Sequence, residues 1–290
     1  MIKYLQLFRI NNWIKNLLVL SPLLFSFNIF HLNQVINSIV AFVAFCFISS
    51  SIYIFNDISD IEKDKVHPRK KDRPLPSGKI SRKKAIILAL ILLFASFAVS
   101  FYISIIFLLV ILTYFLLNTL YNYQLKKYPI IEAFTISINF LLRILAGSVA
   151  IQVIPTEWIM FVTFFLATML TFIKRKSELM ILDEKSVEHR KVLKYYTIQG
   201  LNQLIFISAA LTLAGYVLYT ISHPMFVYEK INWLFYSFIF VAFGIFRFIH
   251  ISESNEFDKE GDPTTLLLKD KYLQVTVVLW SIYLIWVMYF

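Results

Sequence analysis

Long apolar segments recur along almost the whole chain of 290 residues. Each runs for about 18 to 22 residues, the length that an α-helix needs to cross the hydrocarbon core of a bilayer. Hydrophobic residues make up 59% of the chain and charged residues only 16%, whereas a soluble domain typically carries about 25% charged residues. The sequence therefore predicts an all-α integral membrane protein.

Nine segments are predicted to span the membrane, at 13–30, 34–55, 84–101, 104–123, 130–151, 157–173, 199–221, 231–250 and 272–290. The stretch from Ala85 to Tyr121 is apolar for 37 residues. It is too long for one crossing, so we divide it near Phe101–Ser104. The only cysteine, Cys46, lies inside an apolar run and predicts a buried thiol.

Two long charged loops open four spans apart, at Asn56 and at Lys174. This repeated arrangement predicts a polytopic bundle of two four-helix halves plus a ninth helix, in a single domain covering residues 1–290. We expect the two loops, 56–84 and 174–198, to face each other across a central cavity and to carry the active site.

Lysine and arginine are concentrated in alternate connections between the predicted spans. These connections hold 25 of the 28 basic residues, and the opposite connections hold only Lys230. Positive loops face the cytoplasm, so we predict a multi-pass protein of the cell (plasma) membrane with its amino terminus and active-site loops on the cytoplasmic side. The same distribution accounts for the net charge of +10 without nucleic acid as a partner.

Three aspartates leave the second predicted span at helical spacing. If the helix continues, Asp57, Asp60 and Asp64 lie at i, i+3 and i+7 and share one face. Like charges this close repel unless cations lie between them, and carboxylate oxygens suit Mg²⁺, which bridges to substrate phosphates. A solvated acidic helix end is the alternative, disfavoured by the position at the mouth of a membrane bundle. We predict that these aspartates are catalytic metal ligands.

A turn rich in proline, running from His67 to Gly78, follows the aspartates. Prolines and a glycine at this spacing are typical of a fixed turn. Lys70 and Arg73 within it can reach phosphate oxygens, the arginine in bidentate fashion. For each basic residue, the alternative is the ordinary positive charge of a cytoplasmic loop.

The run from Asn56 to Gly78 reads N-D-x-x-D-x-x-x-D followed by H-P, R-P and G. It resembles the first signature of the UbiA-type intramembrane prenyltransferase superfamily. That resemblance implies nine helices, Mg²⁺-dependent transfer involving a diphosphate, and a substrate-binding role for Asn56.

The second half departs from the usual superfamily pattern. Typical aromatic prenyltransferases carry a second aspartate-rich motif where this chain has Lys174-Arg175-Lys176-Ser177-Glu178. A basic pocket suggests another phosphate group on a substrate, which an aromatic acceptor would not need.

This departure is similar to the decaprenyl-phosphate phosphoribosyltransferase branch. That branch also has a beginning like the run from Arg9 to Asn16 and an L-R-x-x-A-G run like Leu142 to Gly147. The resemblance implies that substrates are bound by Lys15, Asn16, Arg143, Lys174, Arg175 and Glu178.

Polar residues also occur inside the predicted spans. Glu132, Asn139 and Arg143 are spaced by seven and four residues, which places them on one helical face. Charged groups within a span usually face a cavity, so we interpret this stripe as a cavity wall with Arg143 near substrate. The alternative is a structural Arg–Glu or capping network. Arg247, near the inner end of a span, can extend its side chain to the interface.

These features together predict transfer of the 5-phosphoribosyl group from phosphoribosyl diphosphate to a polyprenyl phosphate lipid, with Mg²⁺ as cofactor and release of diphosphate. Such a reaction belongs to glycolipid or cell-wall biosynthesis. The alternative enzyme is a polyprenyl diphosphate-dependent prenyltransferase that acts on a small aromatic acceptor. A transporter or scaffold would leave the aligned aspartates unexplained.

Overall fold

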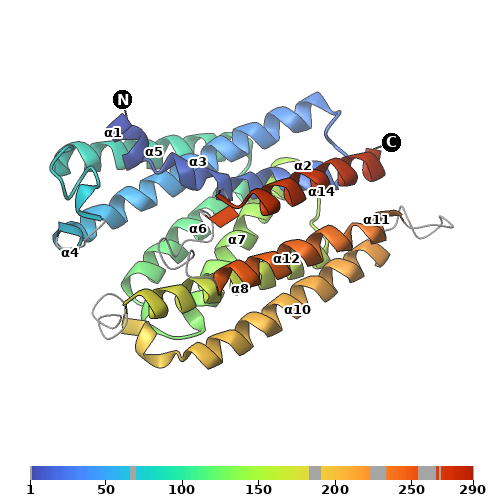
Figure 1. Ribbon diagram of the computed structural model, residues 1–290. Helices are drawn as coiled ribbons and strands as arrows, with labels where there is room; N and C mark the ends of the chain where they lie inside the picture. The colour runs from blue at the N-terminus through green and yellow to red at the C-terminus, as the bar shows by residue number, and fades with distance from the viewer. Residues whose placement is uncertain are drawn as a thin grey trace. The chain divides into compact units, whose positions relative to one another are not determined.

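The computed structural model describes residues 2–65, 70–182, 191–222, 233–253, 266–267 and 269–289. Within these ranges the protein consists of helices and has no strand (Figure 1). The elements long and apolar enough to cross a membrane number eight in the described part of the chain: α3 (Leu32–Ser59), α5 (Arg82–Ile103), α6 (Ile105–Tyr123), α7 (Ile131–Ala150), α8 (Glu157–Leu182), α10 (Ile198–Ser222), α11 with α12 (Trp233–Tyr236 and Phe238–Ser252) and α14 (Lys271–Tyr289). The all-α membrane class is confirmed.

The first predicted span has a different form. After the short helix α1 (Ile2–Leu7), the chain forms an 11-residue 3₁₀ helix, η1 (Ile10–Leu20), and then one turn of α-helix, α2 (Ser21–Phe25). Runs of 3₁₀ helix longer than three or four residues are uncommon. The apolar pattern predicted an ordinary transmembrane helix at 13–30, whereas the structure has shorter helical segments here. The contacts described below determine the 3₁₀ form of η1.

The predicted division of the apolar run from Ala85 to Tyr121 is confirmed. Helix α5 ends at Ile103 and α6 begins at Ile105. Ser104 between them has an extended backbone, and its hydroxyl accepts a hydrogen bond from the N–H of Phe107 at 3.0 Å. A serine in this position caps the new helix, which explains why the run breaks there.

The chain forms two compact units. The first comprises Met1–Tyr123 and Leu142–Pro155, and its core includes Phe45 and Ile48 of α3. Ser51 donates to the carbonyl of Ala89, and Ser96 donates to the carbonyl of Ala44, both at 2.8 Å. Small hydroxyl residues of this kind allow membrane helices to approach closely, and here they join α3 to α5.

The second unit comprises Gln124–Leu141 and Thr156–Phe290. Its core includes Phe172, Ile173 and Leu201, from α8 and α10. The division falls inside α7, so the first half of this helix packs in one unit and the second half in the other.

Candidate functional site

The predicted aspartates stand where α3 ends. Helix α3 stops at Ser59, and a short helix, α4 (Ile61–Lys65), follows Asp60. Helical hydrogen bonding nevertheless continues, because the N–H of Asp60 donates to the carbonyl of Asn56 at 3.0 Å and the N–H of Asp64 to that of Asp60 at 2.8 Å. The helical path assumed for the motif is therefore kept, with a small break at Asp60.

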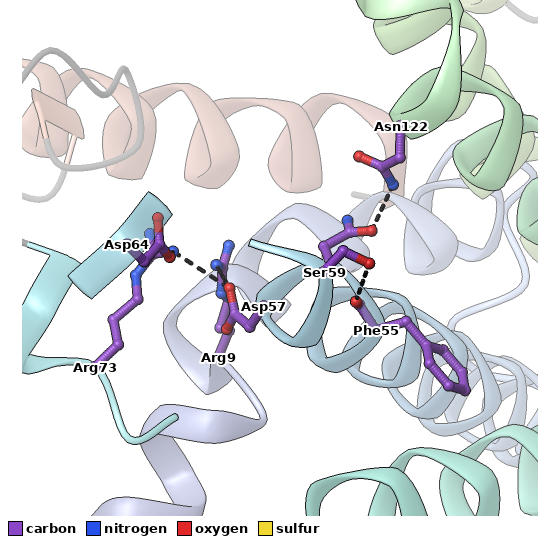
Figure 2. A network of polar contacts seen from close by, with 8 residues as sticks. Arg9, Phe55, Asp57, Ser59, Asp64, Arg73 and Asn122 are labelled. Carbon is purple, nitrogen blue, oxygen red and sulfur yellow. Dashed lines mark hydrogen bonds and ion pairs between the residues drawn. The ribbon is translucent and has the colours of Figure 1, made fainter. Parts of the chain in front are cut away.

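Asp57 and Asp64 converge on one guanidinium, as Figure 2 shows. Nη1 of Arg73 donates to Oδ1 of Asp57 at 3.2 Å and to Oδ2 of Asp64 at 2.9 Å. Arg9 also donates to Oδ1 of Asp57. Both aspartates are buried, at 5% and 3% exposure, and buried carboxylates need such partners. Arg73, which the sequence predicted to reach phosphate oxygens, here contacts both carboxylates. Arg9, which contacts Asp57, was not among the predicted substrate ligands.

Asp60 lies outside this cluster of ion pairs. Its carboxylate is 40% exposed, and Nζ of Lys63 is 3.9 Å away. No group of three His, Cys, Asp or Glu side chains with metal-binding geometry occurs among the described residues. Mg²⁺ commonly uses one or two carboxylates together with substrate phosphates. The buried pair Asp57 and Asp64, which already attracts two cationic groups, fits that donor chemistry.

Asn56 is fixed by a residue that the sequence did not single out. Nδ2 of Asn122, at the end of α6, donates to Oδ1 of Asn56 at 2.6 Å and to the carbonyl of Asn118 at 2.9 Å. This contact ties α6 to the aspartate motif. The residues around Asn122 gave no local signal of a partner in the aspartate motif.

The turn after the aspartates is confirmed where it is described. Gly78 has a φ of 73°, a conformation that favours glycine. Its N–H donates to the carbonyl of Leu75, and that of Ser77 to the carbonyl of Arg73, both at 3.0 Å. These bonds fix the backbone beside Arg73. His67, Pro68 and Arg69 lie outside the described residues, and Lys70 begins the short 3₁₀ helix η2 (Lys70–Asp72).

Two predicted substrate ligands contact each other. Nε of Arg143 donates to Oδ1 of Asn16 at 3.0 Å, and Nη2 donates to the hydroxyl of Tyr114 at 3.0 Å. The guanidinium also lies over the ring of Phe45, 5.2 Å from its centroid. All four residues belong to the first unit. Lys15, the neighbour of Asn16, is half-buried.

The predicted basic motif of the second unit has a buried ion pair. Arg175 is 1% exposed, and its Nε donates to Oε1 of Glu132 at 2.7 Å, a residue that is 0% exposed. Its Nη1 donates to Glu178 at 2.5 Å. Glu132 therefore has an arginine partner, as in the alternative interpretation of the polar stripe. Lys174 is half-buried, and residues 183–190 lie outside the described ranges.

Arg247 joins the end of α12 to the start of α14. Its Nη2 donates to Oδ2 of Asp270 at 2.8 Å, and Oδ1 of Asp270 accepts from the N–H of Leu273 at 2.8 Å. The hydrogen bond from Arg247 lowers the pKa of Asp270, and the bond from Leu273 acts in the same direction. Asp270 thereby caps α14, a role that its sequence position alone did not reveal.

Comparisons with known proteins find relatives along most of the chain. Residues 19–260 match the model of the UbiA prenyltransferase family. A decaprenyl-phosphate phosphoribosyltransferase of Corynebacterium glutamicum is 30% identical, over 97% of this chain and 85% of its own. The corresponding protein of Mycolicibacterium smegmatis is 29% identical, over 94% and 88%. A UbiA homologue from Archaeoglobus fulgidus, bound to GPP and Mg²⁺, has a similar structure, with a TM-score of 0.72, 18% identity, and coverage of 99% of this chain and 98% of that one.

Proposed function

Because this chain belongs to the UbiA prenyltransferase family and is a multi-pass membrane transferase, we propose that it transfers the 5-phosphoribosyl group of phosphoribosyl diphosphate to a polyprenyl phosphate. Diphosphate is the second product. The observation that carries the proposal is the relationship, over nearly the full length, to the two phosphoribosyltransferases. The buried carboxylates with their arginines support a site for a diphosphate.

We propose Mg²⁺ as the cofactor, held by Asp57 and Asp64. Asp60, the third predicted ligand, is exposed and would have to turn toward this pair to join them. When bound, it would neutralise the charge of the departing diphosphate. The Mg²⁺ bound to the Archaeoglobus fulgidus homologue supports this cofactor. Arg73 would then turn from the carboxylates to the diphosphate oxygens, where charge-assisted hydrogen bonds are strong. Lys70 and Asn56 would complete the diphosphate end.

The proposed reaction forms a bond between the anomeric carbon and an oxygen of the lipid phosphate, and it breaks the bond from that carbon to the diphosphate. The lipid phosphate is already an anion, so no strong general base is needed. Catalysis would depend on positioning and on electrostatic stabilisation of an oxocarbenium-like sugar. We assign Lys15 and Lys174 to the 5-phosphate of the donor or the lipid phosphate, and the polyprenyl tail to the bilayer. Glu178 would act at this end by holding Arg175.

The second candidate is a prenyltransferase that takes a polyprenyl diphosphate. GPP bound to the Archaeoglobus fulgidus homologue favours it. The basic motif at Lys174 to Glu178, in the place of a second aspartate motif, argues against it.

Substrate choice tests the two candidates directly. Purified protein with Mg²⁺ should release diphosphate from phosphoribosyl diphosphate only when a polyprenyl phosphate is present. The matched control replaces this lipid with the corresponding polyprenol, which lacks the nucleophilic phosphate. Release with polyprenyl diphosphate and an aromatic acceptor, and none with phosphoribosyl diphosphate, would establish the second candidate instead.

A further inference from the structure

Helix α7 holds η1 at a close backbone contact. A Cβ built on Gly147 would lie 1.9 Å from the carbonyl oxygen of Val19 and 3.1 Å from Cδ of Pro22. One turn earlier on the same face, Arg143 donates to the side chain of Asn16 at 3.0 Å. We call Arg143 and Gly147 the η1 seat. It combines a hydrogen bond with a contact that only glycine allows.

Helix α3 holds η1 from another direction. Nε1 of Trp13 donates to Oγ of Ser50 at 3.0 Å, and this hydroxyl donates to the carbonyl of Phe8 at 2.9 Å. Nδ2 of Asn16 donates to Oγ of Ser49 at 3.0 Å and to Sγ of Cys46 at 3.4 Å. Because long 3₁₀ helices are uncommon, these side-chain contacts explain how η1 keeps its form.

Arg9 immediately precedes η1 and contacts the carboxylate site. Its backbone is left-handed, with φ 51° and ψ 50°, a conformation that residues other than glycine rarely adopt. Its guanidinium pairs with Asp57 and lies 5.0 Å from the ring centroid of Tyr53. The path of η1 therefore determines where this cation lies.

We propose that Arg143 and Gly147 are positioning residues that act through η1. The seat holds η1 in place, and η1 holds Arg9 at Asp57, where its guanidinium contributes to binding of a diphosphate. This inference rests on the proposed function for the location of the diphosphate. It assigns the L-R-x-x-A-G run a role in which Arg143 acts without touching the substrate.

The single cysteine provides a direct readout of the seat. Cys46 is 1% exposed and contacts Asn16, so displacement of η1 should uncover its thiol. Gly147→Ala should speed N-ethylmaleimide labelling of the folded protein by about tenfold or more, the scale on which overpacking shifts a local equilibrium. The matched control is Gly244→Ala, because a Cβ there meets nothing within 4 Å. Equal labelling rates in wild type and Gly147→Ala would refute the claim that the η1 seat holds η1 in place.

Binding of inorganic pyrophosphate in the presence of Mg²⁺ tests the link from the seat to Arg9. Arg9→Met should weaken it by about tenfold or more, the scale of a lost charge-assisted hydrogen bond, and Arg9→Lys should recover part of the loss. Gly147→Ala should also weaken the binding of pyrophosphate. The double variant Arg9→Met/Gly147→Ala should bind pyrophosphate no worse than Arg9→Met alone, because both substitutions remove the same interaction.

The inference fails if Arg9→Met or Gly147→Ala retains wild-type pyrophosphate affinity, or if their effects add. If Gly147→Ala does not yield folded protein, Arg143→Lys takes its place in both experiments, with the same expectations. Both readouts are independent of turnover. A wild-type protein that binds pyrophosphate but does not use phosphoribosyl diphosphate would refute the proposed reaction and leave this inference standing.

Discussion

At the residue scale, two buried carboxylates and two guanidiniums neutralise one another at the end of α3. Arg73 bridges Asp57 and Asp64, and Arg9 shares Asp57. A buried charge is tolerated only with a partner, so a metal that binds these carboxylates must take over the role of an arginine. The released guanidinium then gains an anionic partner if a diphosphate arrives with the metal. We therefore expect metal and donor to bind together more tightly than either alone.

The carboxylates should be essential for turnover. We expect chelation of divalent metal to stop diphosphate release, and Asp57→Ala or Asp64→Ala to abolish it while the protein still inserts into the membrane. The control is Asp72→Ala, because Asp72 is an exposed aspartate of the same loop. Activity would be measured as diphosphate release, and insertion by extraction from washed membranes. Undiminished turnover of stripped, chelated protein would rule out the metal role.

Arg73 should contribute to donor affinity. We expect Arg73→Met to weaken binding of phosphoribosyl diphosphate by about 1.5–3 kcal/mol, the contribution of a hydrogen bond to a charged group. Arg73→Lys should restore part of the lost affinity, because lysine returns the positive charge but not the planar guanidinium that can form two parallel hydrogen bonds. Binding would be measured by calorimetry with Mg²⁺ present, and Lys71→Met, at an exposed position of the same segment, serves as control. Equal affinities for Arg73→Met and wild type would place Arg73 outside the donor site.

At the element scale, α7 and α8 are joined by an ion pair that is almost fully buried. Arg175 and Glu132 are 1% and 0% exposed, and Arg175 also contacts Glu178 one turn along its own helix. Removal of one partner from such a pair leaves a buried charge uncompensated. The K-R-x-x-E motif therefore has a structural component that its basic character did not suggest.

Loss of the Arg175 side chain should mainly lower stability, whereas loss of the Lys174 side chain should mainly weaken substrate binding. We expect Arg175→Met to lower the free energy of unfolding by about 3–5 kcal/mol, and the added change Glu132→Gln to restore part of it. Lys174→Ala should instead weaken binding of the donor or of the lipid phosphate by about 1.5–3 kcal/mol with little loss of stability. Thermal unfolding in detergent and calorimetry separate the two effects. Unchanged stability with weakened binding in Arg175→Met would support Arg175 as a phosphate ligand.

At the scale of the whole molecule, the distribution of lysine and arginine predicts on which side of the membrane the reaction occurs. The predicted cytoplasmic connections include the segments 3–15, 63–84 and 174–194, which carry most of the basic residues. The proposed donor is a soluble anion and should enter from that side, and the proposed lipid acceptor should present its phosphate at the same interface.

Sealed vesicles of known orientation test this topology. Inside-out vesicles should consume phosphoribosyl diphosphate without detergent, and right-side-out vesicles should not, because the charged donor cannot cross the bilayer. Detergent should abolish the difference, which controls for the amount of protein. Equal consumption in both orientations would refute the topology.

The stereochemistry of the product tests direct displacement. Attack opposite the departing diphosphate predicts inversion at the anomeric carbon, from an α donor to a β product. The configuration would be assigned by NMR of the isolated lipid. Retention would argue for a covalent intermediate or for attack from the same face.

The sequence by itself determined the features that depend only on residues close together along the chain. Apolar run length determined the membrane class and most helices, and Ser104 marked the break between α5 and α6. The spacing of the aspartates placed them along one helical path, because helical periodicity is a local property. The signature around them identified the family that the comparisons then confirmed.

Only the tertiary structure decided which side chains meet. Arg9 reaches Asp57 across 48 positions, Arg175 reaches Glu132 across 43, and Arg143 reaches Asn16 across 127. No local pattern specifies such pairs, because each depends on how distant helices pack. The 3₁₀ form of η1 has the same origin: its apolar residues predicted an ordinary span, but the contact with Gly147 and the bonds to α3 act from outside the segment.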